Sequence, residues 1–550
     1  MAPMLGIWFA AVVGLCGMMV EVHSQGAEFW NDQAQNKLKE AIRSAENLNR
    51  KVAKNVVMFV GDGMGPSTVT AARILKGQLA GLNGEEAVLA WEDFPSFGLS
   101  KTYTTDRQTP DSAGTATAYF CGVKAKSGVI GVDDSMEYGV CSANIDTASV
   151  DSVMTHAARA GKATGFVTTA RVTHATPSAL YAHVPRRSWE ADMLIPADQA
   201  GKGCIDIALQ LITRANDTNV ILAGGRVYLM PETDSDPEYP DKKGLRKDGR
   251  NLIEEWISGK DPDTSKYVWK LDDFNKVDTE QTDYLLGLFE RSHMKYEFER
   301  ADDTAGEPSI SEMTEKAIKI LQKDEKGFFL MVEGARIDHG HHDGKPYKAL
   351  YETVAMDKAV AKAMEMTNEE DTLVIVTADH SHVFTMGGNP SRGNPILGLD
   401  DSGYAVDGLP YPTLQYGNGP GAKQDQNSYG ANGMRRNLTD ADVQQPEFEA
   451  PCIFYTDSET HGGEDLAIYA NGPMSHLFHG VHEQNYIAHV VRYAACLDYK
   501  EHCDTERVVP PISHYDPDDQ GCPGSGGSSA VHLHEVLLIF TALFLPLWQI

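Results

Sequence analysis

The chain has 550 residues, 42% of them hydrophobic, which is enough apolar material for a large buried core. Its 78 acidic side chains outnumber the 48 basic ones, so the formal net charge is −30 at pH 7. Because no basic block interrupts this negative charge, the composition argues against nucleic-acid binding.

The first segment is typical of a secretory signal peptide. Residues 6–20 are apolar and are followed by small and polar residues at 24–26, so we predict a signal peptide over residues 1–24. Residues 29–49 then predict an amphipathic helix at the start of the mature chain. Strands and helices alternate from about residue 55 to about residue 493, which is an α/β pattern.

Three of the predicted strands end in residues that can bind metal ions. These strands are apolar runs at residues 55–60, 327–332 and 371–378. The residues that follow them are, in order, Asp62, then Glu333, then Asp379 and His380. Because open α/β sheets place their active sites outside the carboxyl ends of their strands, the pattern predicts a site at this edge.

Further metal-binding candidates lie just beyond the strands. Asp338 and His342 are four residues apart, so a helical turn would present both to a single ion. His461 lies in a loop before another apolar stretch, residues 466–469. Mixed carboxylate and imidazole ligands favour zinc, whereas carboxylates with a hydroxyl favour magnesium. A polar helix start with solvated histidines would explain one such group alone, but not all of them together.

The candidate nucleophile is Ser112. It follows Asp111 and precedes a run of small residues that can start a helix, where backbone N–H groups attract an anion. Considered alone, Ser112 could equally be a helix cap. No Gly-x-Ser-x-Gly motif surrounds it, so activation by a metal ion fits better than a Ser-His-Asp triad.

Taken together, these segments resemble the alkaline phosphatases of the animal GPI-anchored kind. The resemblance runs from about residue 29 to about residue 503, and its most specific motifs are residues 61–65, 110–116, 332–342, 377–382 and 460–465. It implies a large central, mostly parallel sheet with helices on both faces, a small crown insert at about residues 395–456, and an N-terminal helical arm. It also implies hydrolysis of phosphate monoesters at alkaline pH through a phosphoserine intermediate.

The same resemblance implies two zinc ions and one magnesium ion. The ligands it implies are Asp338, His342 and His461 for the first zinc ion; Asp62, Asp379, His380 and the Ser112 oxygen for the second; and Asp62, Thr176 and Glu333 for magnesium. Thr176 stands where the animal enzymes often carry serine, and it keeps the hydroxyl group that a ligand needs.

Other residues carry roles implied by the resemblance without binding a metal. Arg187 is expected to hold the phosphate, and its neighbour Arg186 is the alternative assignment. His174 and His382 are expected to lie just behind the metal ligands. We interpret the remaining two histidines of this region as structural; they are His339 and His341.

A calcium site away from the chemistry is also implied by the resemblance. The matching positions are Glu238, Phe289, Glu290 and Glu307, the last of which replaces a shorter acid. A solvated acidic surface would explain the same residues about as well.

The C-terminal end is typical of a GPI-anchor signal. Residues 524–530 are small, residues 531–535 form a short polar spacer, and residues 536–550 are apolar. A single membrane-spanning helix is the alternative, but the apolar tail is short for that purpose. We therefore predict a catalytic domain over residues 25–520 and an anchor signal over 521–550, with the tail removed. The resemblance adds a homodimer on the extracellular face of the plasma membrane.

The eight cysteines fit an oxidising compartment. The resemblance implies two disulfides, Cys141–Cys204 and Cys496–Cys503. Cys121 lies just after the predicted helix that begins at Ser112, and we interpret it as a free core thiol. Cys452 and Cys522 remain unassigned. Asn216 and Asn437 begin Asn-x-Thr sequons, so both are predicted glycosylation sites.

Two alternative functions differ in class from a phosphomonoesterase. One is a related phosphodiesterase or sulfatase, which would lack the magnesium ligands Thr176 and Glu333. Sulfatases also need a modified residue in a motif that Ser112 does not have. The other is a cell-surface binding protein on the same fold, against which the complete ligand set argues.

Overall fold

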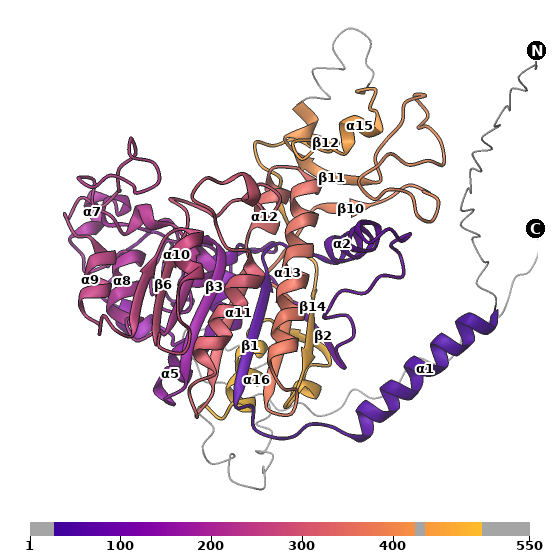
Figure 1. Ribbon diagram of the computed structural model, residues 1–550. Coiled ribbons are helices and arrows are strands. Elements are labelled where there is room, and N and C mark those ends of the chain that lie inside the picture. Colours follow the sequence, from indigo (N-terminus) through magenta and orange to yellow (C-terminus); the bar gives the residue numbers. More distant parts are fainter. Residues whose placement is uncertain (1–26, 424–434, 498–550) are drawn as a thin grey trace, which may run out of the picture. The chain divides into compact units, whose positions relative to one another are not determined.

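The computed structural model describes residues 27–423 and 435–497. A ten-stranded sheet runs through the described chain (Figure 1). The strands, in spatial order, are β15 (Gly480–Glu483), β2 (Ser96–Lys101), β14 (Leu466–Asn471), β8 (Thr372–Ala378), β1 (Asn55–Gly61), β7 (Phe328–Gly334), β3 (Ala163–Arg171), β4 (Val220–Gly224), β6 (Tyr284–Leu288) and β5 (Ser265–Val268).

Most neighbouring strands of this sheet are parallel. Strand β1 pairs with β7 on one side and β8 on the other, so that Val57 lies opposite both Leu330 and Val374. Strand β14 is antiparallel to both of its neighbours, β2 and β8. The three ligand-bearing strands predicted from the sequence are therefore adjacent and parallel, and their carboxyl ends lie together.

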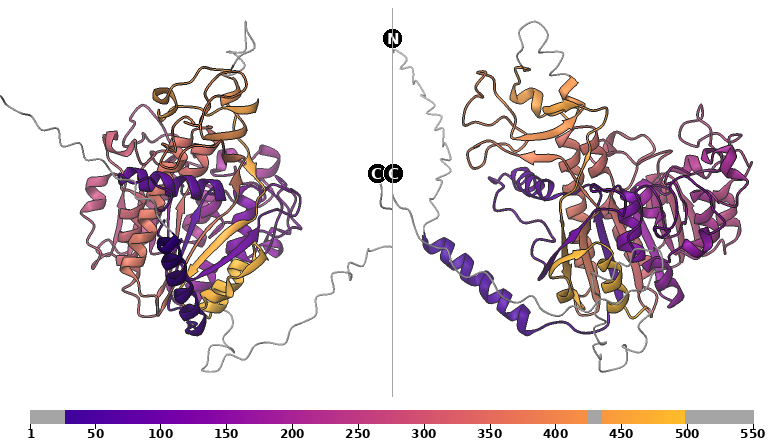
Figure 2. Two further views of the ribbon diagram at one scale, coloured as in Figure 1. Left: turned by 90° about the vertical axis from the view of Figure 1, so that its right-hand side faces the viewer. Right: turned by 180° about the vertical axis from the view of Figure 1, so that it is seen from behind.

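Helices cover both faces of the sheet, as predicted (Figure 2). Alternate residues of β1 point to opposite faces, as the two-residue repeat of a strand requires. On one face, Met58 belongs to a core that includes residues of α3 (Ser112–Cys121), α5 (Val153–Arg159), α8 (Ile207–Arg214), α9 (Leu252–Ser258) and α16 (Tyr486–Ala494). On the other, Phe59 belongs to a core built with α11 (Ile310–Leu321) and α13 (Pro346–Met366).

A second, three-stranded sheet forms the region predicted as the crown. It consists of β10 (Phe384–Met386), β11 (Leu414–Gly419) and β12 (Cys452–Tyr455), and α15 (Asp440–Val443) lies in the same region. It packs through Phe384, Leu414 and Tyr416 against α2 (Pro66–Leu79) and against Leu350 of α13. The second sheet thus begins at residue 384, somewhat before the predicted insert.

The remaining elements are short or lie in loops, apart from α1. They are α1 (Ala27–Glu46), α4 (Ile145–Ala148), α6 (Ala175–Ser178), α7 (Ala197–Ala200), α10 (Leu271–Asn275), α12 (Arg336–His342), the strand pair β9 (Ser381–His382) and β13 (His461–Gly462), and the 3-10 helices η1 (Asp192–Leu194), η2 (Arg226–Tyr228), η3 (Arg300–Asp302) and η4 (Ser475–Leu477). Helix α1 confirms the predicted N-terminal helix, and it buries none of its side chains.

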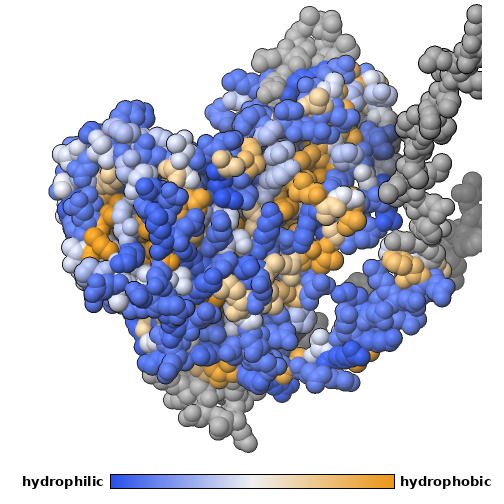
Figure 3. All heavy atoms as spheres, viewed as in Figure 1, coloured by the Kyte–Doolittle hydropathy of each residue, from blue (hydrophilic) through white to orange (hydrophobic). Residues whose placement is uncertain are grey.

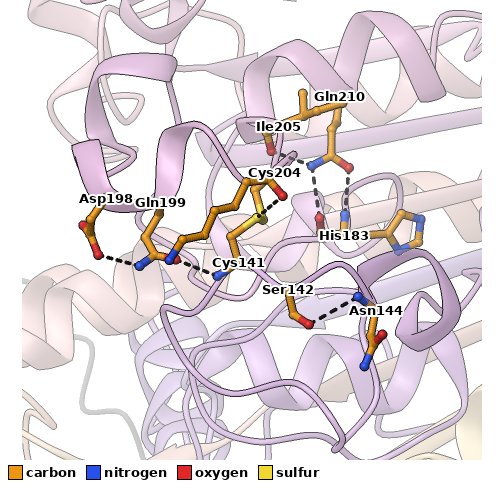
Figure 4. The surroundings of a disulfide bond; sticks show 10 residues. Cys141, Ser142, Asn144, His183, Asp198, Gln199, Cys204, Ile205 and Gln210 are labelled. Atoms are coloured by element: carbon orange, nitrogen blue, oxygen red, sulfur yellow. Dashed lines mark hydrogen bonds between the residues drawn. A yellow bond between two sulfur atoms is a disulfide. The ribbon is translucent and has the colours of Figure 1, made fainter.

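Cys141 and Cys204 form a disulfide bond, as the resemblance implied (Figure 4). The bridge packs against the fully buried Trp189, and the Gln199 side chain accepts a hydrogen bond from the Cys141 backbone N–H at 3.0 Å. Cys121 is buried and forms no disulfide with any described cysteine. Cys496 is also disulfide-bonded, while Cys503 and Cys522 lie outside the described residues.

The face seen in Figure 3 is mostly hydrophilic, with hydrophobic residues in separate patches. Of the helices in the described parts of the chain, none is long and apolar enough to cross a membrane. The predicted signal peptide and anchor signal lie outside the described residues, so they remain predictions.

Candidate active site

The candidate site lies at the carboxyl ends of β8, β1, β7 and β3, four consecutive strands of the large sheet. The chain leaves β1 at Asp62, β7 contains Glu333, and Asp379 follows β8. The loop after β3 leads to His174 and Thr176 at the start of α6. The metal-binding candidates predicted from distant parts of the sequence are therefore brought to one edge of the sheet.

Asp338, His342, His382 and His461 form the first cluster at this edge. Asp338 Oδ1 lies 3.3 Å from His342 Nε2, 3.4 Å from His461 Nε2 and 2.8 Å from His382 Nε2. Burial opposes ionisation of Asp338, but His342 and then His382 and His461 outweigh it and hold the pKa of this carboxyl well below its usual range. The cluster thus contains an ionised carboxylate facing three imidazoles.

Backbone carbonyls determine which nitrogens of these histidines can bind a metal. His342 Nδ1 lies 2.6 Å from the Glu459 carbonyl oxygen, and His461 Nδ1 lies 2.8 Å from that of Pro110. A carbonyl only accepts hydrogen bonds, so each Nδ1 carries a proton and each Nε2 of a neutral ring has a free lone pair. The two Nε2 atoms lie 3.0 Å apart. Two lone pairs at that distance repel one another unless a cation lies between them, so this cluster fits a metal ion.

The second cluster consists of Asp62, Asp379 and His380, all wholly buried, with Ser112 beside it. His380 Nε2 lies 3.1 Å from Asp379 Oδ2, 3.4 Å from Asp62 Oδ1 and 3.1 Å from Ser112 Oγ. Neither carboxylate oxygen of Asp62 accepts a hydrogen bond from any residue that the structure describes. Burial, followed by the charges of Asp379 and Asp338, raises the pKa of Asp62 well above its usual range. Buried acids without partners need a cation to ionise, and this cluster therefore also fits a metal ion.

Asp62 takes part in a third cluster, with Glu333 and His174. Thr168 donates a hydrogen bond of 2.5 Å to Glu333 Oε2, and the Thr176 hydroxyl lies beside the same carboxyl group. Burial is the main cause that raises the pKa of Glu333 to about 8. Oxygen atoms from two carboxyl groups and a hydroxyl are the ligands that magnesium prefers. The residues predicted for magnesium are thus close together, with His174 next to them.

Ser112 is the first residue of α3, and Asp111 caps this helix. The Asp111 side chain accepts hydrogen bonds from the backbone N–H groups of Gly114 at 3.2 Å and Gly128 at 2.9 Å. Ser112 is 2% exposed, and its hydroxyl contacts His380 of the second cluster. It lies at the helix start, where the first backbone N–H groups have no partner within the helix. Arg187 Nη1 donates to Asp111 Oδ2 at 3.0 Å, and its Nη2 lies 3.4 Å from His174 Nε2. These contacts hold the guanidinium group next to the residue that precedes Ser112. Arg186 instead stacks on the ring of Tyr138.

The two histidines interpreted as structural differ from each other. His341 is fully buried, with Nδ1 2.8 Å from the Tyr416 hydroxyl and Nε2 2.9 Å from Thr68 Oγ1. Both of its ring nitrogens are therefore used in hydrogen bonds within the core. His339 instead lies in a cluster with His174 and His293, each offering one nitrogen within 4.8 Å of the others. Nothing in the sequence pattern marks His293, which lies in a loop after β6.

An acidic cluster lies beyond β4 and β6, in the region predicted to bind calcium. The structure groups Glu238 and Glu290 with Asp303, which the sequence pattern did not single out. Glu307 is 1% exposed, and its Oε2 accepts the backbone N–H of Lys295 at 2.8 Å. Phe289 is buried directly after β6. Asp303 could have been found in the sequence only by its place four residues before Glu307. The loop that contains both residues has no periodic pattern that would indicate a ligand.

The fold and this edge define an α/β protein in which clustered metal-ligand groups surround a serine at a helix start. Residues 53–497 match the family model described as alkaline phosphatase, and the chain therefore belongs to the alkaline phosphatase family. Members of this family are phosphoric monoester hydrolases that use zinc and magnesium.

Several known proteins are similar to this chain over most of their length. Alkaline phosphatase from Gadus morhua is 50% identical over 473 residues, which are 86% of this chain and 97% of that protein. The tissue-nonspecific isozyme from Felis catus is 49% identical over 507 residues, covering 91% and 95%. The structure of alkaline phosphatase from the Antarctic bacterium TAB5 superimposes with a TM-score of 0.55 at 24% identity, covering 82% of this chain and all of that one, and it supports the fold.

Proposed function

We propose that this chain hydrolyses phosphate monoesters through a phosphoserine formed on Ser112. The observation that carries this proposal is the second cluster, in which His380 Nε2 lies 3.1 Å from Ser112 Oγ and 3.4 Å from Asp62 Oδ1. Asp62 is a buried carboxylate that accepts no hydrogen bond from the described residues. Such a group is explained by a bound cation next to a nucleophile. The proposal is supported by membership of the family and by the identity of about half of the aligned residues with its vertebrate members.

Two zinc ions and one magnesium ion are the cations that these residues would hold. The ligands would be Asp338, His342 and His461 for one zinc ion; Asp62, Asp379, His380 and Ser112 for the other; and Asp62, Thr176 and Glu333 for magnesium. When bound, they would supply Lewis-acid chemistry, which withdraws charge from phosphate oxygens and makes hydroxyl groups easier to ionise.

The protein's own groups would then bind and orient the substrate. Arg187 Nη1 donates to Asp111, and Nη2 lies 3.4 Å from His174 Nε2. The remaining N–H groups of this guanidinium would bind two phosphate oxygens. The helix start at Ser112 adds backbone N–H donors to the same anion. Ser112 Oγ attacks phosphorus, the alcohol leaves with a proton, and a phosphoserine remains. Water then cleaves the phosphoserine, which releases phosphate and restores the Ser112 hydroxyl.

A second part of the proposal concerns the segments that flank the catalytic domain and the location of the enzyme. We infer that residues 25–520 form this domain, that a signal peptide over residues 1–24 is removed, and that residues 521–550 direct attachment of a GPI anchor. The enzyme would then act on the extracellular face of the plasma membrane, with glycans on the partly exposed Asn216 and the exposed Asn437. The sequence patterns at the two ends and the Cys141–Cys204 disulfide support this location.

A homodimer would explain the exposure of α1. Its apolar residues Phe29, Trp30, Leu38 and Ile42 are all at least 44% exposed. An amphipathic helix of this length gains most of its stability from packing, so a second copy of the chain would cover these side chains.

Calcium is the cation proposed for the acidic cluster beyond β4 and β6. Glu238, Glu290 and Asp303 each offer an oxygen atom, and the buried Glu307 has one oxygen without a partner among the described residues. Carboxylate oxygens are the ligands that calcium prefers. The cluster would act on stability, since it lies away from Ser112.

The covalent intermediate gives the test of this function. Enzyme mixed with a phosphate monoester and quenched at low pH should carry phosphate on Ser112, as mass spectrometry of the peptides would show. Ser112→Ala should abolish the label and nearly all turnover, whereas substitution of the exposed Ser135 by alanine should change neither. A label on another residue, or turnover that survives in Ser112→Ala, would contradict the proposal.

A further inference from the structure

Glu459 is a buried acid that binds no substrate and is not among the proposed metal ligands, yet it contacts two of the site's histidines. It lies in the loop between β12 and β13 and is 1% exposed. A buried carboxylate needs partners to remain ionised. The partners of Glu459 are all groups of the first cluster or directly beside it.

The carboxylate of Glu459 holds the His382 ring in place. Oε2 accepts a short hydrogen bond from His382 Nδ1, and Oε1 accepts the backbone N–H of Val383 at 2.8 Å. The other nitrogen of the same ring, Nε2, donates to Asp338 Oδ1 at 2.8 Å. His382 is therefore fixed between two carboxylates, and the orientation of Asp338 depends on Glu459 through this ring.

The backbone of Glu459 holds His342 by two further hydrogen bonds. Its carbonyl oxygen accepts the His342 Nδ1 proton at 2.6 Å, and its N–H donates to the His342 carbonyl oxygen at 2.9 Å. These contacts select the ring tautomer that leaves Nε2 free for a metal ion. One residue thus orients both the carboxylate and one imidazole of the first cluster.

The second sheet keeps Glu459 in this position. Asn418 on β11 donates to the Thr460 hydroxyl at 2.9 Å and accepts the Thr460 N–H at 3.1 Å. Gly419 follows, and a Cβ atom at this position would lie 3.2 Å from the Cβ atom of Glu459. The close approach of β11 leaves the Glu459 loop little freedom to move.

We propose that Glu459 is a positioning residue that sets the affinity of the Asp338–His342–His461 cluster for its zinc ion. Groups that orient metal ligands typically change metal affinity by about 10- to 100-fold when they are removed. The inference rests on the proposed function only in taking this cluster to be a zinc site.

The test compares Glu459→Gln with Asp457→Asn, which removes the same charge from an exposed position of the same loop. Each zinc-loaded enzyme is mixed with a chromophoric chelator, and the zinc transferred at equilibrium is measured. Glu459→Gln should bind one zinc ion about 10- to 100-fold more weakly than wild type, and its affinity for the other metal ions should not change. Asp457→Asn should bind every metal ion with the affinity of wild type. Added zinc should restore turnover in Glu459→Gln, and the cobalt-substituted form should show an altered visible spectrum.

Each possible result decides between the explanations. Equal zinc affinity in wild type and Glu459→Gln would overturn the inference and leave the proposed function intact. Absence of zinc binding in wild type would overturn the proposed function itself. If Glu459→Gln does not fold, Glu459→Asp replaces it; this variant keeps the charge and should lose less zinc affinity. Unchanged zinc affinity in Glu459→Asp, together with a wild-type visible spectrum of its cobalt-substituted form, would also reject the inference.

Discussion

Two acidic clusters lie at the carboxyl edge of the same sheet, yet their carboxylates are satisfied in different ways. In the candidate active site, neither oxygen of Asp62 has a hydrogen-bond partner among the described residues. In the cluster beyond β4 and β6, Glu238 accepts Arg226 Nη2 at 2.6 Å, and Glu290 lies 3.2 Å from Lys295 Nζ. In the second region only single buried oxygens, Glu307 Oε1 and Asp303 Oδ2, have no partner among the described residues. The protein's own donors therefore neutralise the second cluster more than Asp62, so the need for a bound cation is greater at Asp62.

The strongest test of this comparison is removal of all metal ions. Chelation should lower turnover of a simple monoester by more than about 1000-fold, because several electrostatic groups are lost at once. Adding zinc should restore activity and adding magnesium should raise it further. Calcium alone should restore no turnover, since the second cluster lies away from Ser112 and contains none of the proposed zinc or magnesium ligands. Full activity in metal-free protein would contradict the distinction between the clusters.

Two substitutions on the same helix distinguish a proposed zinc ligand of the first cluster from a neighbouring histidine that is not a ligand. Asp338→Ala should lower kcat by about 100- to 1000-fold and remove one zinc ion, as expected when a group that stabilises the transition state is lost. His339→Ala, one position along the same helix, should lower kcat by less than about tenfold, because the His339 ring lies with His174 and His293 and is outside the cluster of proposed zinc ligands. Steady-state kinetics and metal analysis of both variants measure the difference. Similar losses would show that the ligand assignment is wrong.

The arginines of the two regions sharpen the comparison further. Arg226 is wholly buried and pairs with two carboxylates, those of Asp236 and Glu238. Arg187 is 27% exposed and pairs with one carboxylate, that of Asp111, while its Nη2 lies 3.4 Å from His174 Nε2. Arg187→Ala should therefore weaken inhibition by inorganic phosphate by about 2–3 kcal/mol, the value of a charge-assisted hydrogen-bonded pair. Arg186→Ala, the matched control, should leave phosphate inhibition unchanged. The reverse result would assign the phosphate to Arg186.

Glu352 on α13 is intermediate between Asp62, which has no hydrogen-bond partner among the described residues, and Glu238, which has a cationic one. It is a buried acid whose carboxylate accepts a hydrogen bond from the Glu297 backbone N–H. Burial is the main cause that raises its pKa from 4.5 to about 7. The folded state thus holds the proton more tightly than the unfolded state, and this stabilisation is complete below about pH 4.5 and is lost as the pH rises through about 7. Glu352→Gln should match wild type at pH 4.5 and exceed its unfolding free energy above pH 7, by at most about 3 kcal/mol.

Urea unfolding at several pH values would measure this difference. The exposed Glu365 of the same helix provides the control, and Glu365→Gln should leave the pH dependence as in wild type. An equal stability difference at every pH would show that Glu352 is ionised in both states or in neither.

The sequence predicted the large sheet and the edge of the site because both depend on local patterns. Apolar runs of strand length stop at Asp62, Glu333 and Asp379, and parallel pairing then brings these ends together. The contributions of Asp303, His293 and Glu459 could not be predicted in the same way. These residues lie in loops, and their partners are distant in sequence, so no periodicity relates them. The sequence also could not show which acids Arg226 and Lys295 would satisfy.

The order of the strands has a consequence for how the chain folds during synthesis. Strand β1 emerges early, but both strands that flank it, β7 and β8, are made much later. Until then neither hydrogen-bonding edge of β1 has its native strand partner. Closing such long loops is entropically unfavourable, and unpaired apolar strands are prone to aggregation. We therefore expect the nascent chain to be most prone to aggregation before β8 has been made. The set of proposed metal ligands is complete only once His461 has been made.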